Sequence, residues 1–383
     1  MADIQTFAFP TQIRFGAGAL RVLPDAAKPL MKRPLLLTDT GLSRTPVFPK
    51  VKQVLADAGI PVTVFAGVEG NPTVKHVDGA LAAYRDGACD GVIGVGGGSP
   101  LDVAKAVALM ASHEGSIFDY DDALDGWQRI RPDVPPVIAI PTTAGTGSEV
   151  GRSTVITNTE IEKKVVVFSP SLMPKVAVVD PELALGLPPA LTAATGMDAL
   201  THNIEAYLAT GYHPMCDGIA LEGIRQASMF LRLAVENGQD VGARAGMAMC
   251  SIMGAVAFQK GLGATHSLAH PLSAVCGLHH GLANGIFVAR VMEWNADASR
   301  DRLARIGAVV GASGTKPEMA RGAIRFVREL AAVIGIPDSL SAVGVDPSQI
   351  DHLADLAFED GCHRSNPKPC TRDDFKMLYS AAL

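Results

Sequence analysis

The residues with the clearest capacity for chemistry are four histidines in one stretch of the chain. His266, His270, His279 and His280 lie within residues 261–284, which otherwise hold small and aliphatic side chains and no Asp, Glu, Lys or Arg. Imidazole is the commonest metal ligand near neutral pH, and a dry, apolar surround is what a catalytic metal site needs. A lone buried histidine would more often be a hydrogen-bonded core residue, but four together favour metal or proton chemistry.

A carboxylate and a fifth histidine occur earlier, in an Ala- and Leu-rich segment. Asp198 and His202 are four residues apart, so on the helix predicted over residues 193–209 they share one face. Aspartate plus three histidines suits Fe²⁺ or Zn²⁺ with an open coordination position. The apolar flanks disfavour the alternative, an Asp–His pair on a helix surface. His270 precedes Pro271, which disfavours helical geometry there, and the residues alone leave open which histidines bind.

Two loops in the first half could bind a nucleotide. Residues 94–102 (GVGGGSPLD) follow a predicted strand and open a helix, where glycines and free N–H groups favour a phosphate. Ser99 could cap that helix. Alone, such a Gly-rich turn is no more than a tight turn about half the time. Residues 141–149 (PTTAGTGSE) form a second loop after the next strand, and Asp39 ends another strand, where it could bind a ribose diol or simply cap a turn.

The elements that must position these residues change character along the chain. Short aliphatic runs alternate with helical segments in the first half, which predicts a parallel sheet with helices on both faces. The predicted strands are residues 35–39, 62–65, 91–95, 137–140 and 176–180, with an inserted hairpin at 153–158 and 163–169. After residue 186 the pattern is helical. We therefore expect an α/β Rossmann-like dinucleotide-binding domain over residues 1–186 and an all-α domain over residues 187–383.

Composition narrows the class of protein. The chain has 383 residues, 48% hydrophobic and 19% charged, which suits a globular enzyme of two domains. A net charge of −6 without a basic cluster argues against a nucleic-acid partner. Six cysteines without C-x-x-C spacing indicate reduced thiols, and the N-terminus resembles no signal peptide. With no apolar run expected to span a membrane, we predict a cytoplasmic protein.

Four segments together resemble one family, in order and over nearly the whole chain. They are GGGSPLDVAK (96–105), PTTAGTGSE (141–149), DPELALGLPPALTAATGMDALTHNIEAY (180–207) and HSLAHPLSAVCGLHHGLANGI (266–286). This combination resembles the iron-containing alcohol dehydrogenases. The resemblance implies a dehydroquinate-synthase-like fold with an N-terminal NAD(P)-binding domain and a helical, metal-binding C-terminal domain.

The resemblance also assigns roles to residues. It implies that Asp198, His202, His266 and His280 bind Fe²⁺, with Zn²⁺ as the alternative metal. His270 would lie near substrate and nicotinamide, and His279 would not bind the ion. The alcohol proton would leave through His270, through water or through ribose hydroxyls. The implied cofactor is NAD, which Asp39 would favour over NADP. The remaining implied cofactor-binding residues are Asn71, Gly97, Gly98, Ser99, Asp102, Thr142, Thr143, Thr146, Ser148 and Lys164.

The reaction implied is hydride transfer between nicotinamide and a primary alcohol or aldehyde, with the metal acting as a Lewis acid on the substrate oxygen. The expected partners are that small molecule and further copies of the chain, as a homodimer or higher oligomer, without nucleic acid or membrane. A zinc polyol dehydrogenase of the glycerol type is the nearest alternative. A dehydroquinate-synthase-like lyase would need a cluster of Lys and Arg that the helical half lacks, and a catalytically inactive binding protein would not need all four ligands.

Overall fold

The computed structural model describes residues 11–383 and divides them into two compact units. The sheet unit comprises the described residues up to Thr143 together with Gly147–Gly186. The helical unit comprises Leu187–Leu383 together with the short loop segment Ala144–Thr146. Each unit has its own hydrophobic core, so each can be described by itself.

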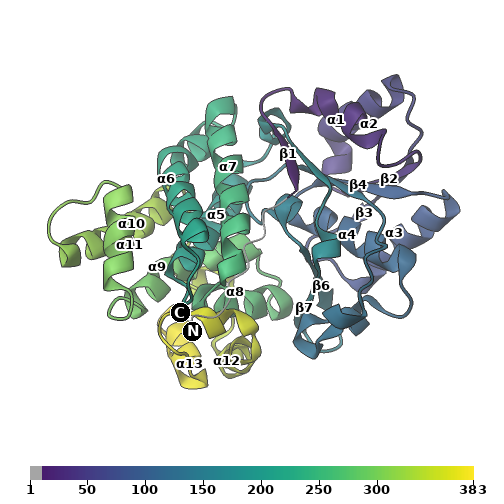
Figure 1. Ribbon diagram of the computed structural model, residues 1–383. Helices are drawn as coiled ribbons and strands as arrows, with labels where there is room; N and C mark the ends of the chain where they lie inside the picture. The colour runs from purple at the N-terminus through teal and green to yellow at the C-terminus, as the bar shows by residue number, and fades with distance from the viewer. Residues whose placement is uncertain (1–10) are drawn as a thin grey trace. The chain divides into compact units, whose positions relative to one another are not determined.

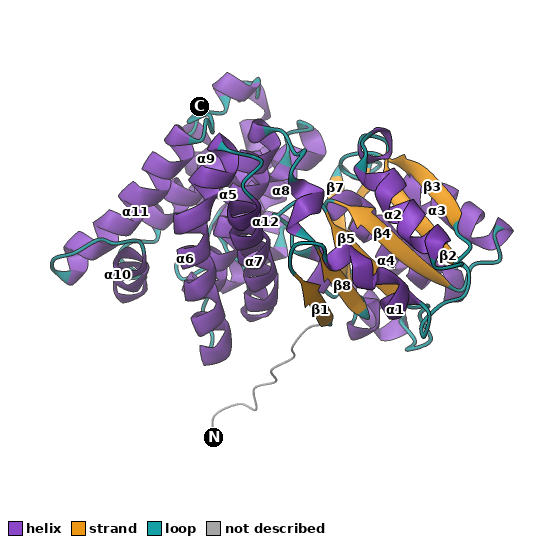
Figure 2. Ribbon diagram, turned by 90° about the horizontal axis from the view of Figure 1, so that it is seen from above, coloured by secondary structure: helices purple, strands orange, loops and turns teal. Residues whose placement is uncertain are grey.

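The sheet unit is built on a six-stranded, all-parallel sheet with the order β1-β8-β5-β4-β2-β3. Its strands are β1 (Gln12–Phe15), β2 (Pro34–Asp39), β3 (Thr63–Val68), β4 (Gly91–Gly96), β5 (Val137–Pro141) and β8 (Val176–Val179). Helices α1 (Leu23–Ala27), α2 (Val47–Asp57), α3 (Val74–Asp86) and α4 (Gly98–Ser112) connect them. A separate antiparallel hairpin consists of β6 (Ser153–Asn158) and β7 (Lys163–Phe168). Figure 2 shows the strands of this unit in orange.

Alternating side chains on each strand explain why helices cover both faces of the sheet. On β2, Leu35 and Leu37 pack into one core cluster with residues of α3 and α4, whereas Leu36 packs into another with residues of α1 and α2. On β4, Val92 packs into the first of these clusters and Ile93 into the second. Successive side chains of a strand point to opposite faces, so a strand that is apolar at every position is buried on both. The predicted doubly wound architecture is therefore confirmed.

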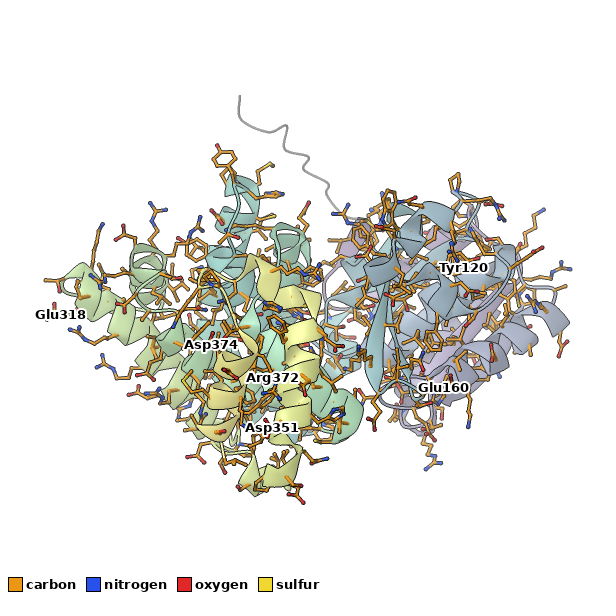
Figure 3. All side chains as sticks on the ribbon, turned by 90° about the horizontal axis from the view of Figure 1, so that it is seen from below. Tyr120, Glu160, Glu318, Asp351, Arg372 and Asp374 are labelled. Carbon is orange, nitrogen blue, oxygen red and sulfur yellow. The ribbon has the colours of Figure 1, made fainter. Side chains whose placement is uncertain are left out.

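The helical unit contains the long helices α5 (Pro189–Leu208), α6 (Pro214–Glu236) and α7 (Val241–Ala257), which lie side by side (Figure 1). The others are α8 (Ala264–Val275), α9 (His280–Trp294), α10 (Arg300–Val309), α11 (Lys316–Val333), α12 (Ile350–Glu359) and α13 (Arg372–Ser380). Helices α12 and α13 pack together, and Arg372 on α13 bonds Asp351 and Asp355 on α12 (Figure 3). Nearly every residue of α5 after Thr192 is buried, so this helix forms the centre of the unit.

The structure differs from the sequence-based description in three places. Strand β1 was not predicted, because four residues at a sheet edge carry little pattern. Helix α4 begins at Gly98, so Ser99 lies inside its first turn rather than capping it. Among the described residues, Val241–Lys260 is long and apolar enough to cross a membrane, although 56% of that window is buried and α7 packs against α5 and α6.

Helix α8 also differs from expectation, since it continues through Pro271. Proline inside a helix removes a hydrogen bond and costs about 3 kcal/mol. Leu268 and Leu272, on either side of it, are fully buried, and α8 packs against α9 and α12. Tertiary packing therefore overrides the local preference, and His270 stays on the helix, one turn after His266.

Candidate active site

Three helices of the helical unit bring four side chains to one point. Asp198 and His202 come from adjacent turns of α5, His266 from the first turn of α8 and His280 from the first residue of α9. Asp198, His202 and His266 are buried, whereas the side chain of His280 is 19% exposed. The group is thus enclosed by protein on most sides and reaches the surface at His280.

The geometry of this group suits a metal ion. One oxygen of Asp198, Oδ1, lies 3.5 Å from His280 Nε2, 3.9 Å from His266 Nε2 and 3.9 Å from His202 Nδ1. Two ligands of a tetrahedral ion with bonds of about 2.1 Å lie about 3.4 Å apart, which is close to these separations. The Nδ1 of His202 is buried without a hydrogen-bond partner among the described residues, as a ligand atom would be.

Burial keeps His202 in the form that a metal requires. Desolvation lowers the pKa of His202 to about 4, although Asp198 acts in the opposite direction. Its imidazole is therefore neutral at pH 7, and a neutral imidazole offers a lone pair to a metal. The carboxylate of Asp198 and the three imidazoles around it form a donor set of the kind that divalent iron and zinc prefer. The residues present fit the metal.

The cofactor residues expected in the sheet unit gather at the carboxyl edge of its strands. Strand β2 ends at Asp39, β4 leads into Gly97, Gly98 and Ser99, and β5 leads into Thr142. These strands are neighbours, with Gly96 opposite Pro141. Because carboxyl ends of parallel strands meet at one edge, and nucleotides bind at that edge in open α/β sheets, these residues have the required placement.

Close packing leaves no room for a side chain at residues 96 and 97 of this turn. A Cβ on Gly97 would lie 3.1 Å from Thr143 Oγ1, and one on Gly96 would lie 2.5 Å from Pro100. The N-terminus of α4 has no side-chain cap, so the first N–H groups of a 15-residue helix remain available to an anion. The residues present fit a pyrophosphate.

The other expected cofactor residues have varied surroundings. Asp39 Oδ1 accepts a hydrogen bond from the Leu42 N–H at 2.7 Å, so it also caps the turn after β2. Asn71 has a positive φ of 50°, which is uncommon outside glycine and occurs often at functional turns. Lys164 pairs across the hairpin with Thr157, whose N–H donates to Pro72 next to Asn71. Thr146 groups with the helical unit rather than with the sheet unit.

Asp102 and Ser148 are occupied with each other. Ser148 Oγ donates to Asp102 Oδ1 at 2.5 Å, and the Val155 N–H donates to Oδ2 at 3.1 Å. The buried ammonium of Lys105 lies 2.6 Å from Ser148 Oγ and 3.2 Å from Asp102 Oδ1. This network ties α4 to the loop after β5 and to β6, so both residues hold the edge of the sheet in shape.

Comparison with known proteins agrees with this geometry. Residues 10–181 match the family profile "Iron-containing alcohol dehydrogenase", and residues 192–383 match "Fe-containing alcohol dehydrogenase family, C-terminal". The 4-hydroxybutyrate dehydrogenase of Cupriavidus necator is 40% identical, over 97% of this chain and 98% of its own length. The chain belongs to the iron-containing alcohol dehydrogenase family.

Solved structures resemble the chain over its full length. A crystal structure of 1,3-propanediol oxidoreductase has a TM-score of 0.95 at 36% identity, covering 99% of this chain and 100% of that one. The sulfoacetaldehyde reductase of Bifidobacterium kashiwanohense, in complex with NAD⁺, has a TM-score of 0.88 at 30% identity, covering 100% and 99%. This iron-containing alcohol dehydrogenase is thus an oxidoreductase acting on CH–OH groups, and the lyase and polyol dehydrogenase alternatives are not favoured.

His270 lies beside the candidate metal-binding group of this alcohol dehydrogenase. Its ring stacks on that of His280, with centroids 5.2 Å apart, and its Nδ1 lies 2.7 Å from Asp360 Oδ2. Asp360 also accepts hydrogen bonds from Ser267 Oγ and from the Cys362 N–H. Burial would raise the pKa of Asp360, but the neighbouring His270 and these hydrogen bonds lower it well below its usual range. Asp360 therefore stays ionised and fixes the ring of His270 through Nδ1.

Three polar residues next to the candidate metal-binding group were not predicted: Glu205, Asn284 and Asp360. Asn284 Nδ2 donates to Asp198 Oδ1 at 2.7 Å and lies 3.2 Å from His280 Nε2. Two of them carried a signal that the sequence offered, since Glu205 lies three residues after His202 and Asn284 four residues after His280, on the same helix faces. His279, by contrast, is exposed and precedes α9.

Proposed function

We propose that Asp198, His202, His266 and His280 hold one divalent iron and that the protein reversibly oxidises a short primary alcohol with NAD⁺. The convergence of three imidazoles within 3.9 Å of Asp198 Oδ1 is the observation that carries this proposal. Once bound, the ion supplies Lewis acidity toward the substrate oxygen and NAD⁺ supplies the hydride acceptor.

The protein's own residues supply positioning and a proton route. Asp360 holds His270 through Nδ1, which leaves Nε2 as the ring atom that can accept the alcohol proton. Asp39 and the Gly97–Ser99 turn would hold the ribose and pyrophosphate at the edge of the sheet, with Asn71, Thr142, Thr143, Thr146 and Lys164 as further contacts. We propose that Asp102 and Ser148 act there by shaping the loop, because their hydrogen bonds are made to each other.

The names of the relatives support a proposal for the substrate class. Hydroxybutyrate, propanediol and sulfoacetaldehyde, named for three of them, are small and carry a polar group at the end opposite the reacting carbon. We propose a primary alcohol or aldehyde of this kind as the substrate of this chain.

We also propose that the boundary between the cofactor domain and the metal domain lies near residue 186. We propose further that the protein works in the cytoplasm as a homodimer or higher oligomer. Light scattering coupled to gel filtration would measure the oligomeric state.

The decisive experiment combines activity with metal analysis. Protein loaded with Fe²⁺ or with Zn²⁺ is mixed with NAD⁺ and a panel of primary alcohols, diols and hydroxy acids, while nicotinamide absorbance is recorded. His266→Ala and His280→Ala should each lose the metal and nearly all activity, whereas His279→Ala should retain both. Metal retained in His280→Ala but lost in His279→Ala would refute the ligand assignment.

A further inference from the structure

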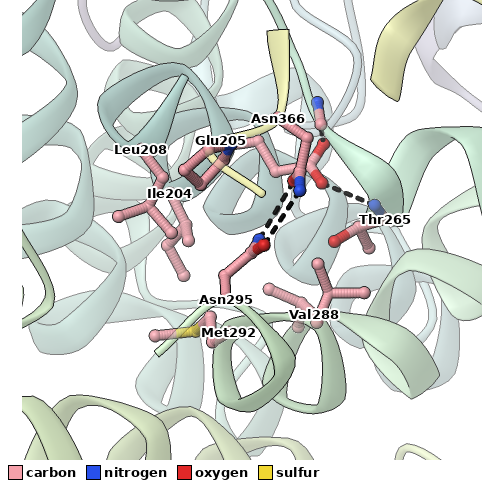
Figure 4. Close-up of a pocket in the computed structure, with 11 residues that line it drawn as sticks. Ile204, Glu205, Leu208, Thr265, Val288, Met292, Asn295 and Asn366 are labelled. Atoms are coloured by element: carbon pink, nitrogen blue, oxygen red, sulfur yellow. Dashed lines mark hydrogen bonds between the residues drawn. The ribbon is translucent and has the colours of Figure 1, made fainter. Parts of the chain in front are cut away.

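Glu205 is a buried carboxylate that the proposed reaction does not use. It lies on α5, one turn after His202, and only 4% of its surface is exposed. Apolar residues of a small cavity, including Ile204, Leu208 and Met292, surround it on one side (Figure 4). Burying a carboxylate among apolar residues costs free energy unless several donors form hydrogen bonds with it. The partners of Glu205 therefore indicate its role.

Among the described residues, the hydrogen bonds to the carboxylate of Glu205 come from the beginning of α8. The N–H groups of Gly263 and Thr265 donate to its two oxygens at 3.0 and 2.6 Å, and His266 Nδ1 lies 2.6 Å from Oε2. Figure 4 shows the carboxylate facing this helix end. Two of the three contacts satisfy backbone groups that an α-helix leaves unpaired at its N-terminus. The third reaches the ring whose other nitrogen faces Asp198.

The contact with His266 fixes which ring nitrogen carries the proton. Glu205 can accept but not donate while it is ionised, so the bond requires a proton on His266 Nδ1. The nitrogen left to bind a metal is then Nε2, which is the atom 3.9 Å from Asp198 Oδ1. A carboxylate on the far nitrogen also makes an imidazole a stronger donor to a metal.

The three donors around this carboxylate, which are the N–H groups of Gly263 and Thr265 and the ring of His266, favour its ionised form. The positive end of the α8 dipole favours the same charge state.

We propose that Glu205 is a positioning residue for the metal site: it holds His266 with Nδ1 protonated and Nε2 directed at the ion. This inference rests on the proposed metal site. It adds the residue that sets how strongly one ligand, His266, binds the ion. The alternative role is purely structural, in which Glu205 serves only to anchor the end of α8.

Two other side chains allow these roles to be separated. Asn366 anchors the same helix end, since its Oδ1 accepts from the Ala264 N–H at 3.2 Å, but no bond joins it to His266. It also forms a reciprocal amide pair with Asn295, drawn in Figure 4. Asp360 holds the other histidine of α8, His270, through Nδ1 at 2.7 Å. Asn366 therefore resembles Glu205 in anchoring the beginning of α8, and Asp360 resembles it in binding the Nδ1 of a histidine.

The test is titration of metal-free protein with Co²⁺, followed by its visible absorption bands, in the wild type and in Glu205→Gln, Asn366→Ala and Asp360→Asn. We expect Glu205→Gln to bind Co²⁺ about 10- to 100-fold more weakly and with altered bands. Asn366→Ala should lose thermal stability but keep the wild-type affinity for Co²⁺ and the wild-type absorption bands. Asp360→Asn should also keep the wild-type Co²⁺ affinity and absorption bands. Wild-type affinity in Glu205→Gln, or an equal loss in Asn366→Ala, would overturn the positioning role.

A second measurement does not depend on any variant folding. In wild-type protein loaded with Zn²⁺ and labelled with ¹⁵N-histidine, the His266 ring should show a protonated Nδ1 and a metal-bound Nε2. The opposite tautomer would refute the proposal. Failure of wild-type protein to bind either ion would instead refute the metal site itself, and the Glu205 role with it.

Discussion

At the scale of single residues, we propose that His270 carries the proton and does not bind the metal. The ring of His270 stacks on His280, and its Nδ1 lies 2.7 Å from the carboxylate of Asp360, which supports this proposal. A positioned acid–base group contributes about 10²–10⁴-fold to a rate. We therefore expect His270→Gln to keep a full complement of metal, to lose activity in that range and to flatten the pH–rate profile near neutrality.

That comparison requires rates at several pH values and metal analysis of the same samples. Asp360→Asn is the matched variant, because it leaves the imidazole in place but removes the charge that orients it, and it should cause a smaller loss. Full activity with an unaltered profile in His270→Gln would assign the proton route to water or to ribose hydroxyls.

Asp39 is the residue that we expect to select the cofactor. It ends β2 beside the Gly-rich turn, and its charge would repel the 2′-phosphate of NADP. Asp39→Gly should raise kcat/KM for NADP by at least about tenfold, which corresponds to about 1.4 kcal/mol. Since Asp39 Oδ1 also bonds the Leu42 N–H, thermal stability should fall slightly. An unchanged NAD/NADP ratio combined with lower stability would leave Asp39 as a turn cap only.

Some residues of the candidate site could be predicted from the sequence, and others could not. Asp198 and His202 were predictable as a pair because a helix brings positions four apart onto one face. Their partnership with His266 and His280 followed from family resemblance and not from spacing. Glu205 and Asp360 could not be assigned to their histidines, because those contacts join residues 61 and 90 positions apart in the chain. No local rule relates such positions before the helices are packed.

At the scale of elements, the separation between α5 and α9 controls the distance from Asp198 to His280. Gly281 allows this separation: a Cβ there would lie 2.1 Å from the carbonyl oxygen of Ala194 on α5. We expect Gly281→Ala to force the helices apart, to cost roughly 1–3 kcal/mol of stability and to weaken metal binding at least about tenfold. Thermal unfolding and Co²⁺ titration would measure the two effects.

Gly218→Ala is the control for that substitution. Gly218 lies on an exposed face of α6, with nothing within 4 Å of an added Cβ, so alanine should be neutral or slightly stabilising there. If Gly281→Ala bound metal as the wild type does, the position of α9 would not determine the site.

Elements also divide into those that the sequence predicts and those that it does not. The buried strands β4 and β5 are apolar at every position, and β2 is apolar from Pro34 to Leu37. These strands were therefore predictable from the sequence, as was the helical half. Helix α8 was not, because Pro271 argues locally against it, and only burial of Leu268 and Leu272 explains why it continues. The helix that carries both His266 and His270 was therefore the least predictable element of the site.

At the scale of the whole molecule, the two units carry different chemistry. The proposed metal ligands all lie in the helical unit, whereas the proposed cofactor residues, except Thr146, lie in the sheet unit. A ligand stabilises the elements that bind it, by about 2.7 kcal/mol at a concentration 100 times its Kd. Each ligand should therefore leave a separate pattern of amide hydrogen exchange on the chain.

We expect metal alone to slow exchange in α5, α8 and α9 and to leave β2, β4 and α4 unchanged, because no proposed ligand lies on those elements. NAD⁺ alone should slow exchange at the end of β2, at the beginning of α4 and in the loop after β5. Peptide-resolved exchange with each ligand, at matched occupancy, measures both patterns. Asp198→Asn, which removes the carboxylate on which the three imidazoles converge, should abolish the metal pattern and keep the NAD⁺ pattern. Protection of the sheet by metal, without protection of α5, α8 or α9, would refute the division of chemistry between the units.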